Sequence, residues 1–267
     1  MVFPLNLWLL LAAALVISSI GFKNYVWFIS LGYGFSIAGE GLLMLLLYGK
    51  SLSVGTVICA VLFIIYGVRL GGYLAIREFG SSAYTKNMKG EIKDGKTIPF
   101  GVKASIWVTC AALYVLQVVP LLYRLNNASE SNLFLYIGAF IMVFGIVFET
   151  VADLQKNASK KINPNRFADT GLYRIVRCPN YLGEMIFWTG VIVSGFGALT
   201  GIGQWVMALV GYVGIIFVMF SGARRLEIRQ NKNYGTDPEY INYVKTVPIM
   251  VPFIPLYSVE KYKWLVG

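Results

Sequence analysis

Long apolar stretches separated by polar segments recur along the whole chain. A helix needs about 20 mostly apolar residues to cross a bilayer, where no water satisfies the backbone. Seven stretches qualify as transmembrane helices: 5–21, 25–48, 53–76, 104–123, 133–151, 181–200 and 204–222. The first lacks the basic n-region of a signal peptide, and no A-x-A cleavage site follows its apolar stretch. The pattern therefore predicts an all-α polytopic membrane protein with seven transmembrane helices.

The distribution of Lys and Arg predicts the orientation, because cytoplasmic loops carry an excess of both. With the N-terminus outside, the inner segments hold 20 of the 23 cations, and the outer segments hold only Lys50 and Arg124. We therefore expect an outside N-terminus and a cytoplasmic C-terminus. The 77–103 loop, the 152–180 loop and the tail from residue 223 would then share the cytoplasmic face. No repeat or flexible linker divides the chain, so we expect a single membrane domain over 1–267.

Composition agrees with this class, since 57% of the residues are hydrophobic and 13% are charged, against about 25% charged in soluble domains. The chain has no His, which removes imidazole acid–base chemistry and most transition-metal sites. Three cysteines, Cys59, Cys110 and Cys178, are too few and too scattered for a disulfide framework. We expect membrane lipids as partners, and neither a metal nor a nucleic acid.

Ionisable side chains inside the predicted spans are candidate site residues, because each costs about 2.5 to 3.5 kcal/mol to insert. Glu40 lies in the middle of the second span, between two glycines that would allow a helix or a ligand to come close. In the third span Tyr66, Arg69 and Tyr73 recur at i, i+3 and i+7, which places them on one helix face. A buried Arg69–Glu40 ion pair, or snorkelling of either group, is the structural alternative.

A second polar cluster follows the fifth span, where Glu149, Asp153 and Lys156 recur at i, i+4 and i+7. Glu184 opens the sixth span shortly after Pro179. These groups are either part of a binding site or simply a solvated helix end. Their occurrence together with the polar groups of the neighbouring spans favours a site.

From Phe148 the chain reads FETVADLQKNASKKINPNRFADTGLYRIVRCPNYLGE. This segment, an ADxQK helix end followed by DTGLxRxxRxPNYxGE, resembles the C-terminal module of the steroid 5-alpha-reductase superfamily, in particular the bacterial-type DUF1295 branch. The resemblance covers about residues 140–255 and closes with YVKTVPIMVPFIP. It implies a seven-helix membrane reductase that passes a hydride from NADPH to a carbon–carbon double bond conjugated to a ketone.

The resemblance also implies cofactor contacts, foremost Asp153, Arg166, Asn180 and Glu184. Basic side chains here would pair with the pyrophosphate and the 2'-phosphate of NADPH, although the positive-inside bias alone would also produce them. Gly171 permits a positive φ, and no GxGxxG motif is present. The residues assigned to the cofactor are Glu149, Asp153, Lys156, Lys160, Arg166, Gly171, Leu172, Arg177, Asn180, Tyr181, Glu184, Arg225, Glu227, Arg229 and Tyr240.

The segment YGVRLGGY, residues 66–73, resembles the part of the family that holds the catalytic tyrosine. The resemblance implies that Tyr66 donates a proton, with its hydroxyl oriented by Glu40, and that Arg69 and Tyr73 contact the substrate. A lipophilic enone, such as a 3-oxo-4-ene steroid, would enter from the bilayer. Residues 1–130 would then form the substrate side and residues 131–267 the cofactor-binding module.

Other functions stay open at this point. The isoprenylcysteine carboxyl methyltransferases, which use S-adenosylmethionine, also carry an RxPxYxG stretch, but typically with His where Cys178 stands. A sterol double-bond reductase would use the same cofactor. A non-enzymatic lipid-binding or transport protein is the third alternative. The membrane is the bacterial inner membrane, or the endoplasmic reticulum if the source is a eukaryote.

Overall fold

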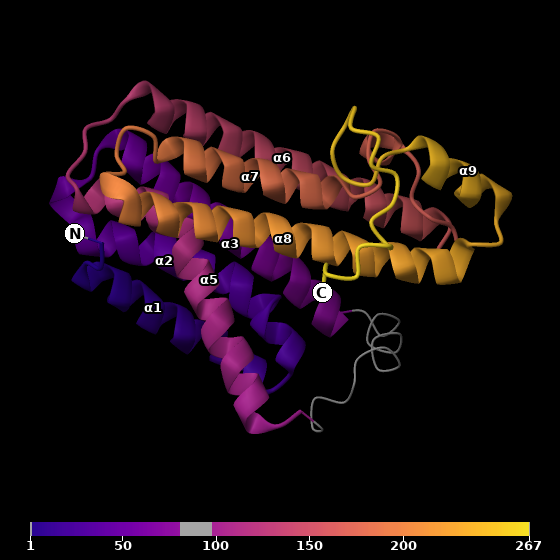
Figure 1. Ribbon diagram of the computed structural model, residues 1–267, viewed down its shortest axis with the longest axis horizontal. Helices are drawn as coiled ribbons and strands as arrows, with labels where there is room; N and C mark the ends of the chain where they lie inside the picture. Colours follow the sequence, from indigo (N-terminus) through magenta and orange to yellow (C-terminus); the bar gives the residue numbers. More distant parts are fainter. Residues whose placement is uncertain (1, 81–97, 267) are drawn as a thin grey trace. The chain divides into compact units, whose positions relative to one another are not determined.

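A computed structural model describes residues 2–80 and 98–266, and all regular structure in these residues is helical. The α-helices are α1 (Leu5–Ser18), α2 (Leu31–Tyr48), α3 (Val54–Gly80), α5 (Phe100–Asn126), α6 (Leu133–Ile162), α7 (Pro179–Ser194), α8 (Gly201–Tyr234) and α9 (Pro238–Thr246) (Figure 1). Short 3-10 segments cover Ser19–Phe22, Tyr25–Phe28, Gly49–Ser51 and Gly171–Arg174. Most of the predicted 77–103 loop, residues 81–97, lies outside the described residues.

Six helical segments of the described chain are long and apolar enough to cross a membrane: Leu5–Phe22, Tyr25–Ser51, Val54–Gly80, Phe100–Asn126, Leu133–Ile162 and Gly201–Tyr234. The predicted span 181–200 does not join them. Its helix, α7, has 16 residues and is about 24 Å long, shorter than the roughly 30 Å hydrocarbon layer. The apolar sequence continues beyond Ser194, but it turns there, with Gly197 and Gly201 at φ of 77° and 78°. The seventh span and the orientation of the termini therefore stay predictions.

The chain divides into two compact units. The first comprises Met1–Ala139 and Val191–Tyr212, and the second comprises Phe140–Gly190 and Val213–Gly267. The boundaries fall inside α6, α7 and α8, so each unit contains parts of these three helices. The residues expected to face the substrate lie in the first unit, and those expected to hold a cofactor lie in the second.

In the first unit α2 packs against α1, α3 and α5. Glycines allow the backbones of α2 and α3 to come into direct contact. A Cβ atom on Gly67 would lie only 2.5 Å from the Ala38 nitrogen. A Cβ atom on Gly41 would lie 2.7 Å from the Ala60 carbonyl oxygen. The expectation that the glycine next to Glu40 admits a neighbouring helix is confirmed at Gly41. This contact fixes the side of α2 that faces α3.

Substituting Gly67 with alanine is expected to destabilise the first unit strongly. The added methyl group would overlap the backbone of α2, and overpacking of this kind costs about 1 to 3 kcal/mol. Gly72, on the same helix, provides a matched control, since a Cβ atom there meets nothing within 4 Å. Thermal unfolding in detergent should show a midpoint lower by about 5 °C for Gly67→Ala and no decrease for Gly72→Ala. Equal midpoints for the two variants would contradict the contact.

Arg124, predicted as an outer-loop cation, is instead buried, with 1% of its surface exposed. Its guanidinium donates to the carbonyl oxygens of Ser194 (3.0 Å), Glu130 (2.6 Å) and Phe196 (3.0 Å) and to the Asn132 side chain (3.1 Å). Arg124 therefore joins the ends of α5 and α7 and the start of α6 within the first unit. Unpaired C-terminal carbonyls of helices are favourable partners for a cation, which explains why this charge is tolerated inside.

In the second unit α6 packs closely on α7, and α7 lies against α8. A Cβ atom on Gly145 would lie 2.5 Å from the Phe187 nitrogen, and one on Gly183 would lie 2.7 Å from the Glu149 nitrogen. The Tyr181 hydroxyl lies 3.4 Å from the Cβ position of Gly222. α6 and α8 have 30 and 34 residues and extend past the predicted spans as polar helices, which carry the charged groups of the second unit.

Candidate functional site

The first unit encloses the residues expected to act on a substrate. Glu40 on α2 and Tyr66 on α3 are both fully buried, with 0% of their surface exposed. Arg69 and Tyr73 follow Tyr66 on α3 and are partly exposed. The predicted helix is confirmed, so the three α3 residues share a face at i, i+3 and i+7.

The expected hydrogen bond between Glu40 and Tyr66 is not formed. Neither carboxyl oxygen of Glu40 has a hydrogen-bond partner among the described residues. The Tyr66 hydroxyl instead lies 3.1 Å from the hydroxyl of Tyr33, which precedes Glu40 by two turns of α2. The prediction of this pairing was wrong, because the tight contact of α2 and α3 aligns Tyr33, rather than Glu40, with the end of the Tyr66 side chain.

Tyr33 and Tyr114 join Glu40 and Tyr66 as buried polar residues of the first unit. The sequence did not single them out. The rings of Tyr33 and Tyr114 pack at a centroid distance of 5.2 Å, and the Tyr114 hydroxyl donates to the Phe28 carbonyl oxygen at 2.6 Å. Tyr33 lies seven residues before Glu40, on the same face of α2, which was the available signal. Because the chain contains 17 tyrosines, that signal was weak.

Gln117 is a further buried polar residue of the first unit. It follows Tyr114 by three residues on α5 and is 3% exposed. Neither its side-chain oxygen nor its side-chain nitrogen has a hydrogen-bond partner among the described residues. Buried polar groups are normally hydrogen-bonded, either to protein or to water or a ligand. The Gln117 amide and the Glu40 carboxyl group have no such partner in the described chain. Glu40 and Gln117 are therefore candidates for binding the polar end of a lipophilic molecule.

In the second unit, acidic side chains lie on α6 and α7, two helices that pack closely at Gly145 and Gly183. Glu149 and Asp153 on α6 are 3% and 6% exposed, and Glu184 on α7 is 5% exposed. The alternative of a solvated helix end is therefore wrong for Glu149 and Asp153. Gly183 sets the distance between the helices, since a side chain there would overlap the backbone of Glu149. Asn180 and Tyr181 belong to the first turn of α7, which begins at Pro179, a favourable first helical residue.

Two of the expected phosphate-binding cations have partners within the unit. The Lys160 ammonium group donates to the carbonyl oxygens of Pro164 (3.1 Å) and Arg166 (2.5 Å) and to the Tyr234 hydroxyl (3.0 Å). The Arg166 guanidinium pairs with Asp169 at 2.7 Å and with Glu239 at 2.5 Å, and these carboxylates raise the pKa of Arg166. Lys160 and Arg166 thus connect α6, the 163–170 loop and α9.

Gly171 has a φ of 61°, one of the conformations that the sequence analysis expected a glycine to permit there. A side chain there would overlap the Gln155 amide, whose oxygen accepts a hydrogen bond from the Leu172 backbone N–H at 2.8 Å. The positive φ therefore favours glycine here, and a Cβ atom would also displace the Gln155 amide. Gln155, in the ADxQK segment, was not among the predicted site residues, although it holds the DTGL turn against α6.

Arg177 has the environment most suggestive of a binding site. Its side chain is 1% exposed and pairs with the fully buried Glu227 carboxylate at 2.8 Å. The same nitrogen, Nη2, also donates to the Tyr257 carbonyl oxygen. The other two nitrogens, Nε and Nη1, have no hydrogen-bond partner among the described residues. An anion or a carbonyl oxygen would satisfy these donors, which gives the predicted cofactor role of Arg177 a physical basis.

Three further predicted cofactor residues of the second unit lie on the polar part of α8 and on α9: Arg225, Arg229 and Tyr240. Arg225 and Arg229 on α8 are exposed, whereas Tyr240 on α9 is buried and donates to the Asn231 side chain at 2.7 Å. Burial raises the pKa of Tyr240 to about 12. Tyr240 also packs with Phe167, Tyr234 and Tyr243. Tyr240 therefore stabilises the packing of α9 on the unit. Arg225 and Arg229 are the accessible positive charges among these residues.

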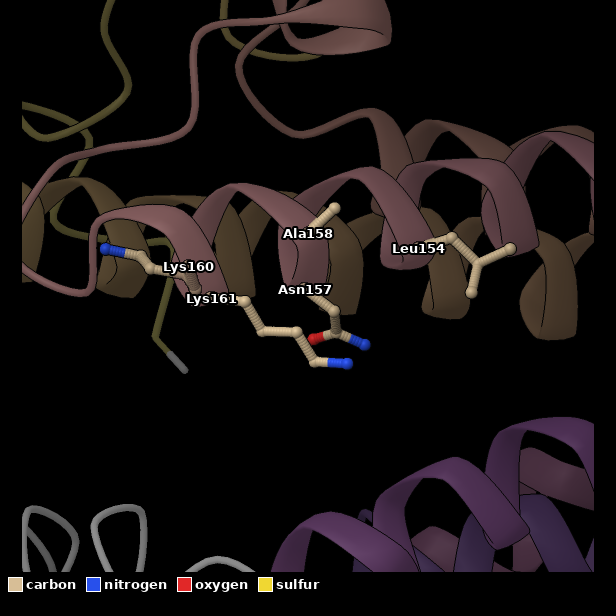
Figure 2. Close-up of a pocket in the computed structure, with 5 residues that line it drawn as sticks. All are labelled: Leu154, Asn157, Ala158, Lys160 and Lys161. Carbon is tan, nitrogen blue, oxygen red and sulfur yellow. The ribbon is translucent and has the colours of Figure 1, made fainter.

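An open depression lies on the polar part of α6, lined by Leu154, Asn157, Ala158, Lys160 and Lys161 (Figure 2). Leu154, Asn157 and Lys161 recur at the spacing of one helix face, and Asn157 and Lys161 project to the same side (Figure 2). All five residues belong to α6, so the depression is a helix surface rather than an enclosed site.

Cys178 is expected to be unreactive in the folded protein. It is 1% exposed, and burial raises the pKa of its thiol to about 12. Since the thiolate is the reactive form, alkylation should be very slow at pH 8 and should accelerate as the pH rises toward 12. The measurement uses a variant with Cys59→Ala and Cys110→Ala, labelled by iodoacetamide before and after denaturation. Rapid labelling of the folded protein at pH 8 would contradict the burial of this thiol.

By the length and composition of its helices, the chain is an integral membrane protein, and the regular structure of its described residues is all helical. It belongs to the DUF1295 family, described as proteins of unknown function. The family model matches residues 15–247, which cover most of both units. No curated protein and no solved structure matches the chain. Among the described residues, no group of three or more Cys, Asp or Glu side chains is arranged to hold a metal ion.

Proposed function

We propose that this protein is an NADPH-dependent membrane reductase that transfers a hydride to the carbon–carbon double bond of a lipophilic enone. Family membership and the ADxQK and DTGLxRxxRxPNYxGE motifs support a relation to the steroid 5-alpha-reductase superfamily. The observation that carries the proposal is Arg177, a fully buried guanidinium with two nitrogens, Nε and Nη1, that lack a hydrogen-bond partner in the described chain.

The second unit supplies groups that fit the cofactor. Arg177 offers unpaired donors for a phosphate oxygen. Arg225 is an exposed cation two residues before Glu227, the carboxylate that pairs with Arg177. Glu184 and Asp153 are buried acceptors suited to hydroxyl or amide groups of a ribose or a nicotinamide. When bound, NADPH would supply the hydride. The residues of the second unit would bind and orient it through these polar contacts.

The first unit would supply the proton and stabilise the developing charge. Addition of a hydride at the β-carbon of an enone leaves negative charge on the carbonyl oxygen, and a preorganised donor in a dry site stabilises this charge. The Tyr66 hydroxyl would be that donor and the proton source. Tyr33, 3.1 Å from Tyr66, would orient the hydroxyl. Because Tyr66 and Glu40 are 0% exposed, a substrate would reach them only after neighbouring side chains move.

The test is binding of unmodified cofactors to the purified full-length protein, measured by calorimetry. We expect NADPH to bind, and NADH to bind about tenfold or more weakly, since loss of the 2'-phosphate removes charge-assisted hydrogen bonds. S-adenosylmethionine should not bind. Binding of S-adenosylmethionine alone would favour the methyltransferase alternative, and binding of none of the three would favour a lipid-binding or transport protein.

A pair of surface variants makes the test specific to the site. Arg225→Gln removes an exposed cation of the proposed site and should weaken NADPH binding, with a smaller effect on NADH. Lys245→Gln removes an exposed cation from α9 in the same unit and should leave both affinities unchanged. An equal loss in the two variants would indicate non-specific attraction to the net positive charge of the chain and would argue against a defined phosphate site.

A further inference from the structure

The C-terminal segment after α9 comes back to α8 (Figure 1), and polar contacts hold it there. The Glu227 Oε2 atom accepts from the backbone N–H groups of Val259 (2.8 Å) and Glu260 (3.0 Å). Arg224, one turn earlier on α8, donates to the carbonyl oxygens of Glu260 (2.9 Å) and Leu265 (3.3 Å). The C-terminal residues are therefore held against α8, and Arg224 contacts them at both Glu260 and Leu265.

Trp264 lies at the level of the apolar part of α8. Its ring stacks on Phe217 at a centroid distance of 6.0 Å. Phe217 precedes Arg224 by seven residues, which is about 10 Å along a helix, and it belongs to the uncharged stretch 201–223 of a candidate membrane span. The chain end thus reaches the depth at which α8 changes from polar to apolar.

The side chains of residues 261–266 have the chemistry of a bilayer interface. Trp264 and Val266 are 66% and 70% exposed, whereas Leu265 is 3% exposed and holds the segment against the protein. Lys261 and Lys263 flank the aromatic residues and are exposed. Trp and Tyr are enriched at headgroup level, and lysines beside them interact with anionic lipids.

We propose that residues 261–266 form an interfacial anchor, in which Trp264 and Val266 insert at the headgroup–acyl boundary and Lys261 and Lys263 bind anionic headgroups. Three observations support a lipid leaflet as the partner: continuity with a membrane-spanning helix through Phe217, exposed apolar side chains, and positive charge beside them. The same anchor holds the segment that carries Val259 and Glu260 against Glu227. The proposal is independent of the reductase activity.

The depth of Trp264 can be measured in nanodiscs containing the full chain. The Trp fluorescence of a Trp264→Phe variant is subtracted from that of the unmodified protein, which isolates the signal of Trp264. Lipids brominated near the headgroup should quench this signal, and lipids brominated near the chain ends should quench it less. Quenching by aqueous iodide without quenching by brominated lipid would overturn the anchor. A signal shielded from both quenchers would indicate coverage by protein and would also overturn it.

The contribution of Lys261 and Lys263 to binding anionic lipids can be tested with a matched control. We expect the unmodified protein to unfold at a temperature about 2 to 4 °C higher in nanodiscs containing phosphatidylglycerol than in phosphatidylcholine alone. Lys261→Gln with Lys263→Gln should abolish this difference. Lys232→Gln with Lys245→Gln removes two exposed lysines of the same unit and should preserve it. Equal loss in both double variants would mean that net charge alone is sensed, which would overturn a defined anchor.

Discussion

Replacing Tyr66 with phenylalanine is expected to lower turnover of an enone substrate by about 100-fold or more, because loss of a general acid typically costs about 10² to 10⁴ in rate. NADPH affinity should stay nearly unchanged, since the proposed cofactor groups belong to the second unit. The measurement is oxidation of NADPH with a 3-oxo-4-ene steroid, together with calorimetric binding of NADPH. Full activity of Tyr66→Phe would remove Tyr66 from the reaction.

Tyr136→Phe is the control for this substitution. Tyr136 belongs to the first unit but is 47% exposed on α6, so removal of its hydroxyl should change neither turnover nor binding. A comparable loss of activity in both variants would indicate a general effect on the helices rather than loss of a proton donor.

Two further variants separate the possible partners of Tyr66. Tyr33→Phe keeps the ring that packs on Tyr114 and removes the hydroxyl that meets Tyr66. Because no hydrogen bond joins Glu40 to Tyr66, we expect Tyr33→Phe to reduce turnover more than Glu40→Gln does. The opposite order would mean that Glu40 approaches Tyr66 during catalysis, as the family resemblance implies.

Glu227→Gln is expected to have the largest effect on stability. The substitution leaves the Arg177 guanidinium, 1% exposed, without its counter-charge, and breaking a buried ion pair in this way costs about 3 to 5 kcal/mol. The unfolding midpoint should fall by about 10 °C. Trypsin should also cleave faster after Lys261 and Lys263, because the same carboxylate holds the Val259 and Glu260 backbone.

Glu239→Gln serves as the comparison. Glu239 also pairs with an arginine, Arg166, but its side chain is 66% exposed, and exposed ion pairs contribute little to stability. We expect almost no change in the unfolding midpoint or in the rate of cleavage. If Glu239→Gln destabilised the protein as much as Glu227→Gln, burial of the Arg177–Glu227 pair would not explain the effect.

Local sequence information predicted most of the helices. It also predicted that the glycine beside Glu40 lets a neighbouring helix come close, as Gly41 does. The apolar stretch 104–123 lies within α5, and the stretch 53–76 begins one residue before α3 and otherwise lies within it, because apolar length directly reports a membrane-spanning helix. The predicted span 181–200 is not confirmed, because its helix ends at Ser194 and glycines with positive φ turn the chain there. Hydropathy cannot detect such an end, because the turn residues there are as apolar as the helix.

From the amino-acid sequence alone, apolar length established a helical membrane protein, and Glu40, Tyr66 and the charged C-terminal half stood out as unusual. Which of these polar groups meet follows from the packing of the helices. Tyr33 rather than Glu40 reaches Tyr66, and Arg177 pairs with Glu227 across 50 residues of sequence. Helical periodicity defines the face on which a side chain lies, whereas the glycine contacts between helices set the register that brings two faces together.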